Sequence, residues 1–202
     1  MHTAASTMAG PRLRPAPIPI VRPPARIMDE PAGDEGLVAR AQAGDRAAFA
    51  ALINRHYEFI YRVGYKWLGN QADAEDVAQN VCIKLATAIM GFDGRSKLTS
   101  WLYRLTINAA HDYRRVQKRQ SKKAEALASE TSDAIDPDQS THLENEDLWR
   151  AVRALPDKQR DAVLLVYAEE LNHAEAAVVM GCKEATVSWY IHEAKKALKG
   201  AV

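Results

Sequence analysis

The apolar residues of this chain recur every three or four positions from Leu37 onward, and this spacing limits its possible folds more than any other feature. In one stretch, Val77, Val81, Leu85 and Ile89 follow one another at intervals of four. This interval places them on one face of an α-helix. The alternation of apolar and polar residues that marks a β-strand does not appear after Leu37. The chain is therefore predicted to be all-α.

Breaks in this pattern divide the chain into two small helical domains joined by a flexible linker. The first stretch is rich in Pro, Ala and Arg without periodicity, a composition that predicts a disordered tail. A later stretch around Asp136 and Pro137 is rich in Ala, Ser and acids, and predicts the linker. The expected boundaries are 1–33 for the tail, 34–119 for the first domain, 120–142 for the linker and 143–202 for the second domain. The tail contains Met28, an alternative candidate for the translation start.

Local sequence signals predict where the helices begin and end. In the first domain, Gly69 and Asn70 break a helix, Asp73 begins the next one, and a long helix runs from about Lys97 into Arg119. The second domain is expected to hold helices over 144–154, 157–171, 174–180 and 183–199. There, Asn172, Glu175 and Gly181 have the spacing of a capping box followed by a left-handed helix end. A short helix, a glycine turn and a longer helix predict a helix-turn-helix.

The net charge of +1 over 202 residues hides an uneven distribution. Basic residues gather between Lys97 and Arg119, whereas acids concentrate between Glu125 and Asp147. No run approaches the roughly 20 apolar residues of a membrane span, so we expect a cytoplasmic protein without membrane insertion.

The sequence gives no pattern of an enzyme or a metalloprotein. Cys82 and Cys182 lack the Cys-x-x-Cys or Cys/His spacing of zinc sites, and we expect both to be buried, reduced thiols. His111 has no carboxylate or nucleophile placed near it by the sequence. We therefore expect no metal, no cofactor and no catalytic residue.

One polar stripe in the first domain lies opposite the apolar face of its helix. It consists of Asp73, Asp76, Gln79 and Asn80. Acids followed by amides suit docking against a basic groove of another protein, where charge steers the approach and amides fix the register. An ordinary solvated acidic face is the alternative interpretation.

The next helix has one apolar and one basic side. Its apolar side is predicted to carry Leu98, Leu102, Leu105, Ala109 and Val116. Nearly opposite are Arg104, Asn108, His111, Arg115 and Lys118, with Trp101 on a flank. Cations that neutralise phosphates, an amide that bonds base edges and an aromatic ring that stacks suit melted DNA. The alternative is a solvated helix face with Trp101 in the core.

The last helix is predicted to bury Val187, Ile191, Ala194 and Leu198. Its outward face then carries Ser188, Trp189, His192, Lys195, Lys196 and Lys199. Such a helix can insert into the major groove while its basic residues reach phosphates. The alternative is a helix that packs against a protein through Trp189 and Tyr190.

These motifs, in this order, resemble the extracytoplasmic-function (ECF) group of the bacterial sigma-70 family. The stretch from Asp73 to Gln79 is similar to region 2.2 of that family, and the stretch from Phe92 to Arg115 is similar to regions 2.3 and 2.4. Leu155 to Arg160 and Leu171 to Leu198 resemble region 4. The resemblance implies a transcription initiation factor that binds core RNA polymerase, melts and reads the −10 element with region 2, and reads the −35 element with region 4.

The resemblance also implies partners and site residues. The partners are promoter DNA and core RNA polymerase, through its β′ clamp helices and β flap; an anti-sigma factor stays an open further partner. Polymerase-binding residues are Asp73, Asp76, Gln79 and Asn80. Residues for the −10 element are Lys97, Trp101, Arg104, Asn108, Arg114 and Arg115. Residues for the −35 element are Lys183, Thr186, Ser188, Trp189, His192, Lys195 and Lys196.

The chain departs from the family pattern at two places. Asn80 stands where an acid is usual, which weakens the expected polymerase contact, and the recognition helix has fewer cations than usual. Two other functions compete with the initiation factor: a sigma-like decoy that binds an anti-sigma factor without reading DNA, and a two-domain helix-turn-helix repressor. The basic stripe argues against the decoy, and the polar stripe from Asp73 to Asn80 argues against the repressor.

Overall fold

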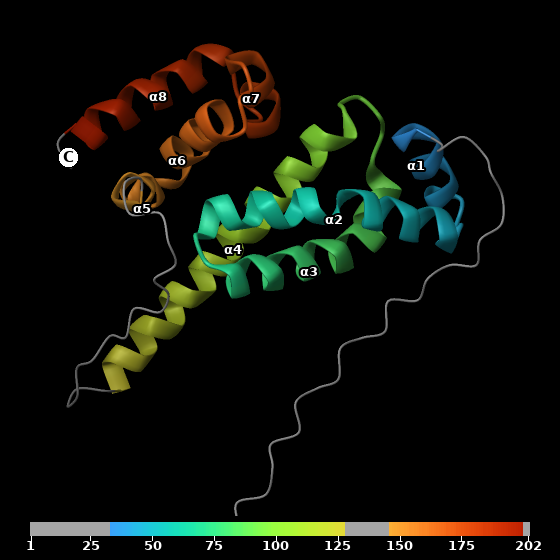
Figure 1. Ribbon diagram of the computed structural model, residues 1–202, viewed down its shortest axis with the longest axis horizontal. Helices are drawn as coiled ribbons and strands as arrows, with labels where there is room; N and C mark the ends of the chain where they lie inside the picture. The colour runs from blue at the N-terminus through green and yellow to red at the C-terminus, as the bar shows by residue number, and fades with distance from the viewer. Residues whose placement is uncertain (1–32, 128–145, 200–202) are drawn as a thin grey trace, which may run out of the picture. The chain divides into compact units, whose positions relative to one another are not determined.

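The computed structural model describes residues 33–127 and 146–199, and every regular element in these two ranges is a helix (Figure 1). The predicted all-α fold is therefore confirmed. The elements are α1 (Asp34–Gln42), α2 (Arg46–Leu68), α3 (Gln71–Ala88), the 3-10 turn η1 (Ile89–Gly91), α4 (Leu98–Leu127), α5 (Glu146–Ala154), α6 (Asp157–Val163), the π-helical turn η2 (Leu164–Ala168), α7 (His173–Met180) and α8 (Glu184–Lys199). The predicted tail and most of the predicted linker lie outside the described residues.

In the first half of the chain, α2 packs against α1, α3 and α4. The side chain of Asp45 caps α2 by accepting hydrogen bonds from the backbone N–H groups of Ala47 and Ala48. The helix ends at Gly69, whose φ of 75° lies in the left-handed region. Glycine adopts this conformation without a steric penalty, so the predicted break at Gly69 is confirmed.

Helix α3 begins at Gln71, slightly before the predicted start at Asp73. The reason is its cap: Asn70 Oδ1 accepts a hydrogen bond from the backbone N–H of Asp73 at 3.0 Å, so Asp73 already lies in the first turn. The loop after α3 is fixed by α1, because Gln42 Nε2 donates to the carbonyls of Ile89 and Phe92, each at 2.8 Å.

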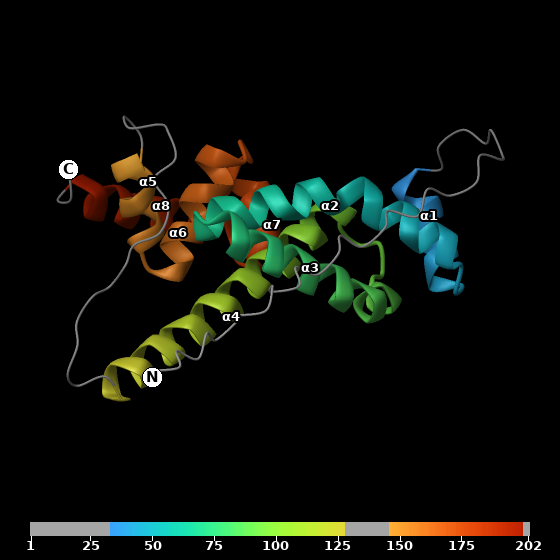
Figure 2. The same cartoon turned by 60° about the horizontal axis from the view of Figure 1, so that its bottom comes forward.

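Helix α4 continues to Leu127, past the predicted end at Arg119. The added turns consist mainly of Lys, Ala and Glu, which are strong helix formers. In both views the C-terminal part of α4 extends past the other helices (Figures 1 and 2). Val116 is therefore 49% exposed, and its predicted place on the buried side was wrong.

In the second half, the predicted continuous helix over 157–171 is replaced by α6 and η2. The backbone N–H of Glu169 bonds the carbonyl of Leu164 at 3.0 Å, five residues back, as in a π-helical turn. Glu170 follows with a φ of 56°, an uncommon value for a residue with a side chain. The predicted capping box of Asn172 and Glu175 and the left-handed end at Gly181 are both confirmed.

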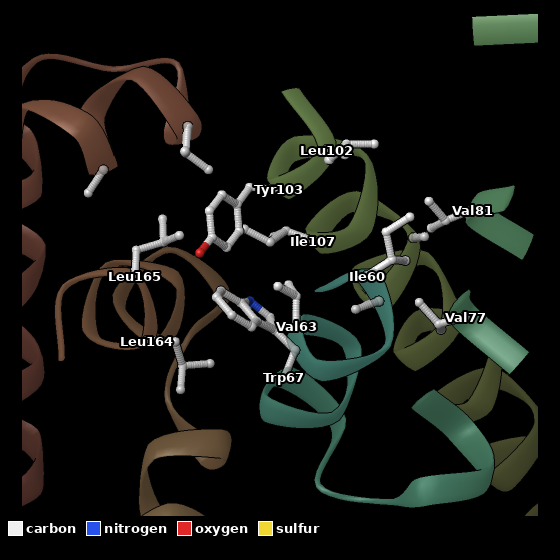
Figure 3. Close-up of a cluster of buried hydrophobic side chains, with 14 of the residues drawn as sticks. Ile60, Val63, Trp67, Val77, Val81, Leu102, Tyr103, Ile107, Leu164 and Leu165 are labelled. Atoms are coloured by element: carbon white, nitrogen blue, oxygen red, sulfur yellow. The ribbon is translucent and has the colours of Figure 1, made fainter. Parts of the chain in front are cut away.

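The two halves share one hydrophobic core (Figure 3). Trp67 from α2 and Tyr103 from α4 lie beside Leu164 and Leu165 from η2, and all four side chains are buried. The sequence predicted two domains connected only by a linker, so this direct packing is a feature that it did not reveal. The cysteines also differ from expectation: Cys82 and Cys182 are free thiols, but both are half-buried.

Candidate protein and nucleic-acid interfaces

The polar stripe on α3 divides in the structure. Asp76, Gln79 and Asn80 are exposed, as a docking surface requires, but Asp73 is half-buried. The Asp73 carboxylate accepts a hydrogen bond from the Tyr113 hydroxyl at 2.6 Å, which ties α3 to α4. Burial and this bond raise the pKa of Tyr113 above its ordinary value. Asp73 therefore already has a side-chain partner within the chain.

One residue of the same face was missed from the sequence. Ile83 is 74% exposed and follows Asn80 by three positions, so it continues the stripe along α3. An isoleucine this exposed gains free energy if a partner covers it. Helical periodicity could have identified Ile83, because it lies opposite the buried Val81 and Leu85. We call the exposed set of Asp76, Gln79, Asn80 and Ile83 the docking stripe.

The residues expected to bind the −10 element fall into two groups. Lys97, Asn108 and Arg115 are exposed, and Arg115 pairs with Asp112 at the surface. Trp101 is half-buried, and its ring centre lies 5.1 Å from that of Phe92. Its burial is intermediate between the two interpretations that the sequence offered, a ring that stacks on DNA and a core residue. These residues can reach a partner without any rearrangement of the backbone.

Arg104 and Arg114 form the second group, because both contact the other half of the chain. Arg104 Nε donates to the carbonyls of Val178 at 3.0 Å and Val179 at 3.2 Å, and its Nη2 also donates to Val178. Arg114 Nη2 donates to the carbonyl of Arg153 at 3.1 Å. In this conformation neither guanidinium group is free to bind phosphate with those nitrogens.

Two carboxylates from the second half lie at the same contact. Asp161, with a side chain 3% exposed, accepts a hydrogen bond from Trp67 Nε1 at 2.8 Å and lies 2.9 Å from His111 Nε2. Glu169, 5% exposed, accepts from the Tyr103 hydroxyl at 2.6 Å and forms an ion pair with Lys66 Nζ at 2.7 Å. Burial and the bond to Glu169 raise the pKa of Tyr103 well above its ordinary value.

A small cleft of about 210 Å³ lies where these elements meet. Its lining includes Arg104, Asn108 and His111 from α4, with Lys158 and Asp161 from α6. The sequence could not have brought these groups together, since periodicity shows which side of a helix is polar but not which element faces it.

The outward face of α8 has the predicted rotation. Val187, Ile191 and Ala194 are buried, whereas Trp189 is 55% exposed. Most other residues expected at the −35 element are exposed as well: Lys183, Ser188, His192, Lys195 and Lys196; Thr186 is half-buried. The surface therefore combines an aromatic ring with cations, a composition that suits a nucleic-acid groove.

Some of these residues also make contacts within the second half. Lys195 Nζ lies 5.2 Å from the centre of the Tyr167 ring, and His173 Nδ1 is 2.9 Å from Ser188 Oγ. Both contacts lie at the surface and are replaceable by contacts to a partner. No group of three or more potential metal ligands occurs among the residues that the structure describes, and no helix there is long and apolar enough to cross a membrane.

Two family models match the chain in the order of the two halves. Residues 52–120 match sigma-70 region 2, and residues 145–198 match sigma-70 region 4. The chain is 30% identical over 176 residues to the ECF RNA polymerase sigma factor SigW of Bacillus subtilis, with 80% of this chain and 92% of that protein covered. It is also 30% identical over 189 residues to the ECF RNA polymerase sigma-E factor of Haemophilus influenzae, with 87% and 98% covered.

Solved structures agree on the fold. The sigma factor RpoE of Bartonella quintana, solved with the anti-sigma factor NepR, matches with a TM-score of 0.57 and 23% identity, covering 76% of this chain and 95% of that chain. CnrH, solved with the cytosolic domain of CnrY, matches with a TM-score of 0.58 and 23% identity, covering 83% and 95%. On the sequence identities, the two region models and this fold, the chain belongs to the ECF group of the sigma-70 family of RNA polymerase sigma factors.

Proposed function

We propose that this chain is a promoter-specificity factor that binds core RNA polymerase, helps to melt a promoter and is then released. The observation that carries this proposal is the presence of both sigma regions in one chain, each with an exposed face of the chemistry that its role requires. The factor contributes binding and positioning, with no bond chemistry of its own, and it acts in the cytoplasm, where the polymerase works.

The docking stripe on α3 is the surface proposed to bind the β′ clamp helices. Asp76 supplies charge that steers the approach, Gln79 and Asn80 supply hydrogen bonds, and Ile83 supplies apolar area. Asp73 supports this surface from within, since its bond to Tyr113 holds α3 against α4.

The basic face of α4 is proposed to bind the melted −10 element. Asn108 and Arg115 are exposed on α4, and Lys97 lies just before the helix. Arg104 and Arg114 share the basic face and join this site when their present partners are released. Cations along a backbone groove with an aromatic ring nearby are the usual means of holding a single strand.

Helix α8 is proposed to read the −35 element from the major groove. Trp189 and Ser188 lie near its N-terminal half, which in a helix-turn-helix contacts base edges. Lys195 and Lys196 lie further along and reach phosphates. The β flap is the proposed second polymerase contact, made by the same half of the chain.

In vitro transcription with purified core polymerase tests this function against its two competitors. An initiation factor yields transcripts from promoter fragments selected out of genomic DNA. A decoy gives no transcript and binds no DNA, and a repressor binds duplex DNA but gives no transcript with core polymerase alone. Absence of transcripts, together with binding to an anti-sigma factor, would favour the decoy.

A further inference from the structure

The loop that connects η1 to α4 is held by one side chain of α1. The half-buried Gln42 donates from Nε2 to the carbonyls of Ile89 and Phe92, each at 2.8 Å. These carbonyls follow the last turn of α3, where backbone acceptors have no partner within the helix. An amide NH₂ carries two donors, so one side chain can serve both acceptors. Gln42 therefore closes the end of α3 and fixes the start of the loop.

The loop itself is compact and carries this fixed point forward to α4. Asp93 Oδ1 accepts a hydrogen bond from the backbone N–H of Arg95 at 3.1 Å, which closes a tight turn. The carbonyl of Lys97 then accepts from the backbone N–H of Trp101 at 3.2 Å and begins the hydrogen bonding of α4. A displacement at Phe92 is therefore passed on to Lys97.

Phe92 also contacts the aromatic ring of the candidate −10 site. The ring centres of Phe92 and Trp101 lie 5.1 Å apart, with an angle of 52° between the ring planes. Such a contact depends on how the two rings are oriented. Gln42 therefore acts on Trp101 through Phe92, because it holds the backbone that carries the Phe92 ring.

Beyond these two bonds, the loop and α1 stand apart over much of their length. A groove of about 700 Å³ opens between them. Asp34, Val38 and Gln42 contribute to its α1 side, and Phe92 and Lys97 contribute to its other side. Close packing does not hold the loop to α1 across this groove, so the hydrogen bonds of Gln42 are the fixed connection at one end of it.

Helix α1 is itself well anchored and can serve as a support. Leu37 and Val38 are buried, and α1 packs on α2. Asp34, its first residue, lies 2.8 Å from Arg55 Nη1 and 3.1 Å from His56 Nε2, both on α2. The amide at the last residue of α1 is therefore presented from a helix whose other end is fixed.

We propose that Gln42 is a positioning residue of the −10 site, which holds the loop so that Lys97 and Trp101 face the melted strand together. It acts through the loop and does not touch DNA. This inference rests on the proposed function of α4, and it adds to that site α1, a helix that carries no predicted site residue. A residue that only caps α3 would contribute to stability but would leave promoter melting by the folded chain unchanged.

The experiment removes the donor at position 42 in the full chain. Gln42→Glu keeps the size and shape of the side chain, but a carboxylate cannot donate and is repelled by the two carbonyls. Gln42→Met, a neutral side chain of similar length without a donor, covers the case in which the added charge unfolds the chain. Gln71→Glu makes the same chemical change at an exposed residue in the first turn of α3 and is the matched control.

The first measurement is fluorine NMR of the chain labelled with 5-fluorotryptophan. It gives one resonance for each of the four tryptophans, assigned by Trp→Phe variants: Trp67, Trp101, Trp149 and Trp189. We expect Gln42→Glu and Gln42→Met to move the Trp101 resonance and to leave the other three in place. The control should reproduce the wild-type spectrum.

The second measurement is permanganate footprinting with core polymerase, on a promoter that the wild-type chain opens. We expect both variants at position 42 to reduce the open bubble about tenfold, as when the competent position of the loop is populated only about one tenth of the time. Their affinity for core polymerase should equal that of the wild type, because the docking stripe is unchanged. Gln71→Glu should open the promoter like the wild type.

Three results would overturn the proposal. If the Trp101 resonance stays in place in both variants, Gln42 does not position this ring. If it moves but the bubble is unchanged, Gln42 only caps α3. If both variants unfold the chain, Gln42 is a residue of the fold alone. A wild-type chain that opens no promoter refutes the proposed function instead, and the Trp101 resonance then decides the link between Gln42 and the ring.

Discussion

Truncation of Ile83 tests the docking stripe most directly. Full burial of an isoleucine contributes about 1.5–3 kcal/mol, and Ile83 is still 74% exposed, so most of that area is available to a partner. Ile83→Ala removes most of the apolar side chain, and we expect it to weaken polymerase binding by about 1–2 kcal/mol, roughly 5- to 30-fold in Kd. The fold should be unaffected, because changes at exposed positions usually alter the free energy of unfolding by less than about 0.5 kcal/mol.

The assay titrates a labelled fragment of the β′ clamp helices with the full chain and follows anisotropy. Leu148→Ala is the matched control, because Leu148 is an aliphatic residue 44% exposed on α5, away from α3. The control should bind the fragment like the wild type. Equal Kd values for Ile83→Ala and the wild type, with both proteins folded, would show that α3 does not dock through this face.

Three further outcomes are expected. Arg115→Glu should reduce promoter melting more than polymerase binding, since Arg115 is exposed on the basic face of α4; an unchanged permanganate footprint would contradict that role. Lys195→Ala should weaken binding to promoter and random duplexes alike and lower the salt slope by about one unit, and an identical slope would remove this lysine from the phosphate contacts. Glu170→Gly should raise the melting temperature, because glycine relieves the φ of 56° at a gain of about 1 kcal/mol; an unchanged or lower value would show that the position is not strained.

Local sequence chemistry predicted the capped helix ends well because those ends depend on neighbouring residues. Asn172 and Glu175 satisfy each other's backbone groups across three positions, and Gly69 and Gly181 adopt left-handed conformations that other residues avoid. None of these features needs tertiary contacts. They could therefore be read from the chain alone.

Periodicity failed where tertiary structure decides the outcome. Val116 lies on the apolar side of α4 by spacing, yet it is exposed because the helix extends past its neighbours. The π-helical turn at η2 was missed because its residues, such as Leu164 and Leu165, fit a regular helix equally well. The sequence thus predicted the type of each element better than its exact length.

Periodicity has the same limit at the candidate site, and there the limit affects the functional interpretation. Periodicity places Arg104 and Arg114 on the polar side of α4, but a polar side is one that needs hydrogen-bond partners, which water, phosphate or backbone carbonyls can all supply. The partners found here are mainly helix C-termini, and no run of acidic residues in the sequence marks a helix C-terminus as anionic. A face suited to bind phosphate is therefore also suited to bind the C-terminal ends of two helices, α5 and α7. The same residues that predict DNA binding from the sequence thereby allow one half of the chain to hold the other.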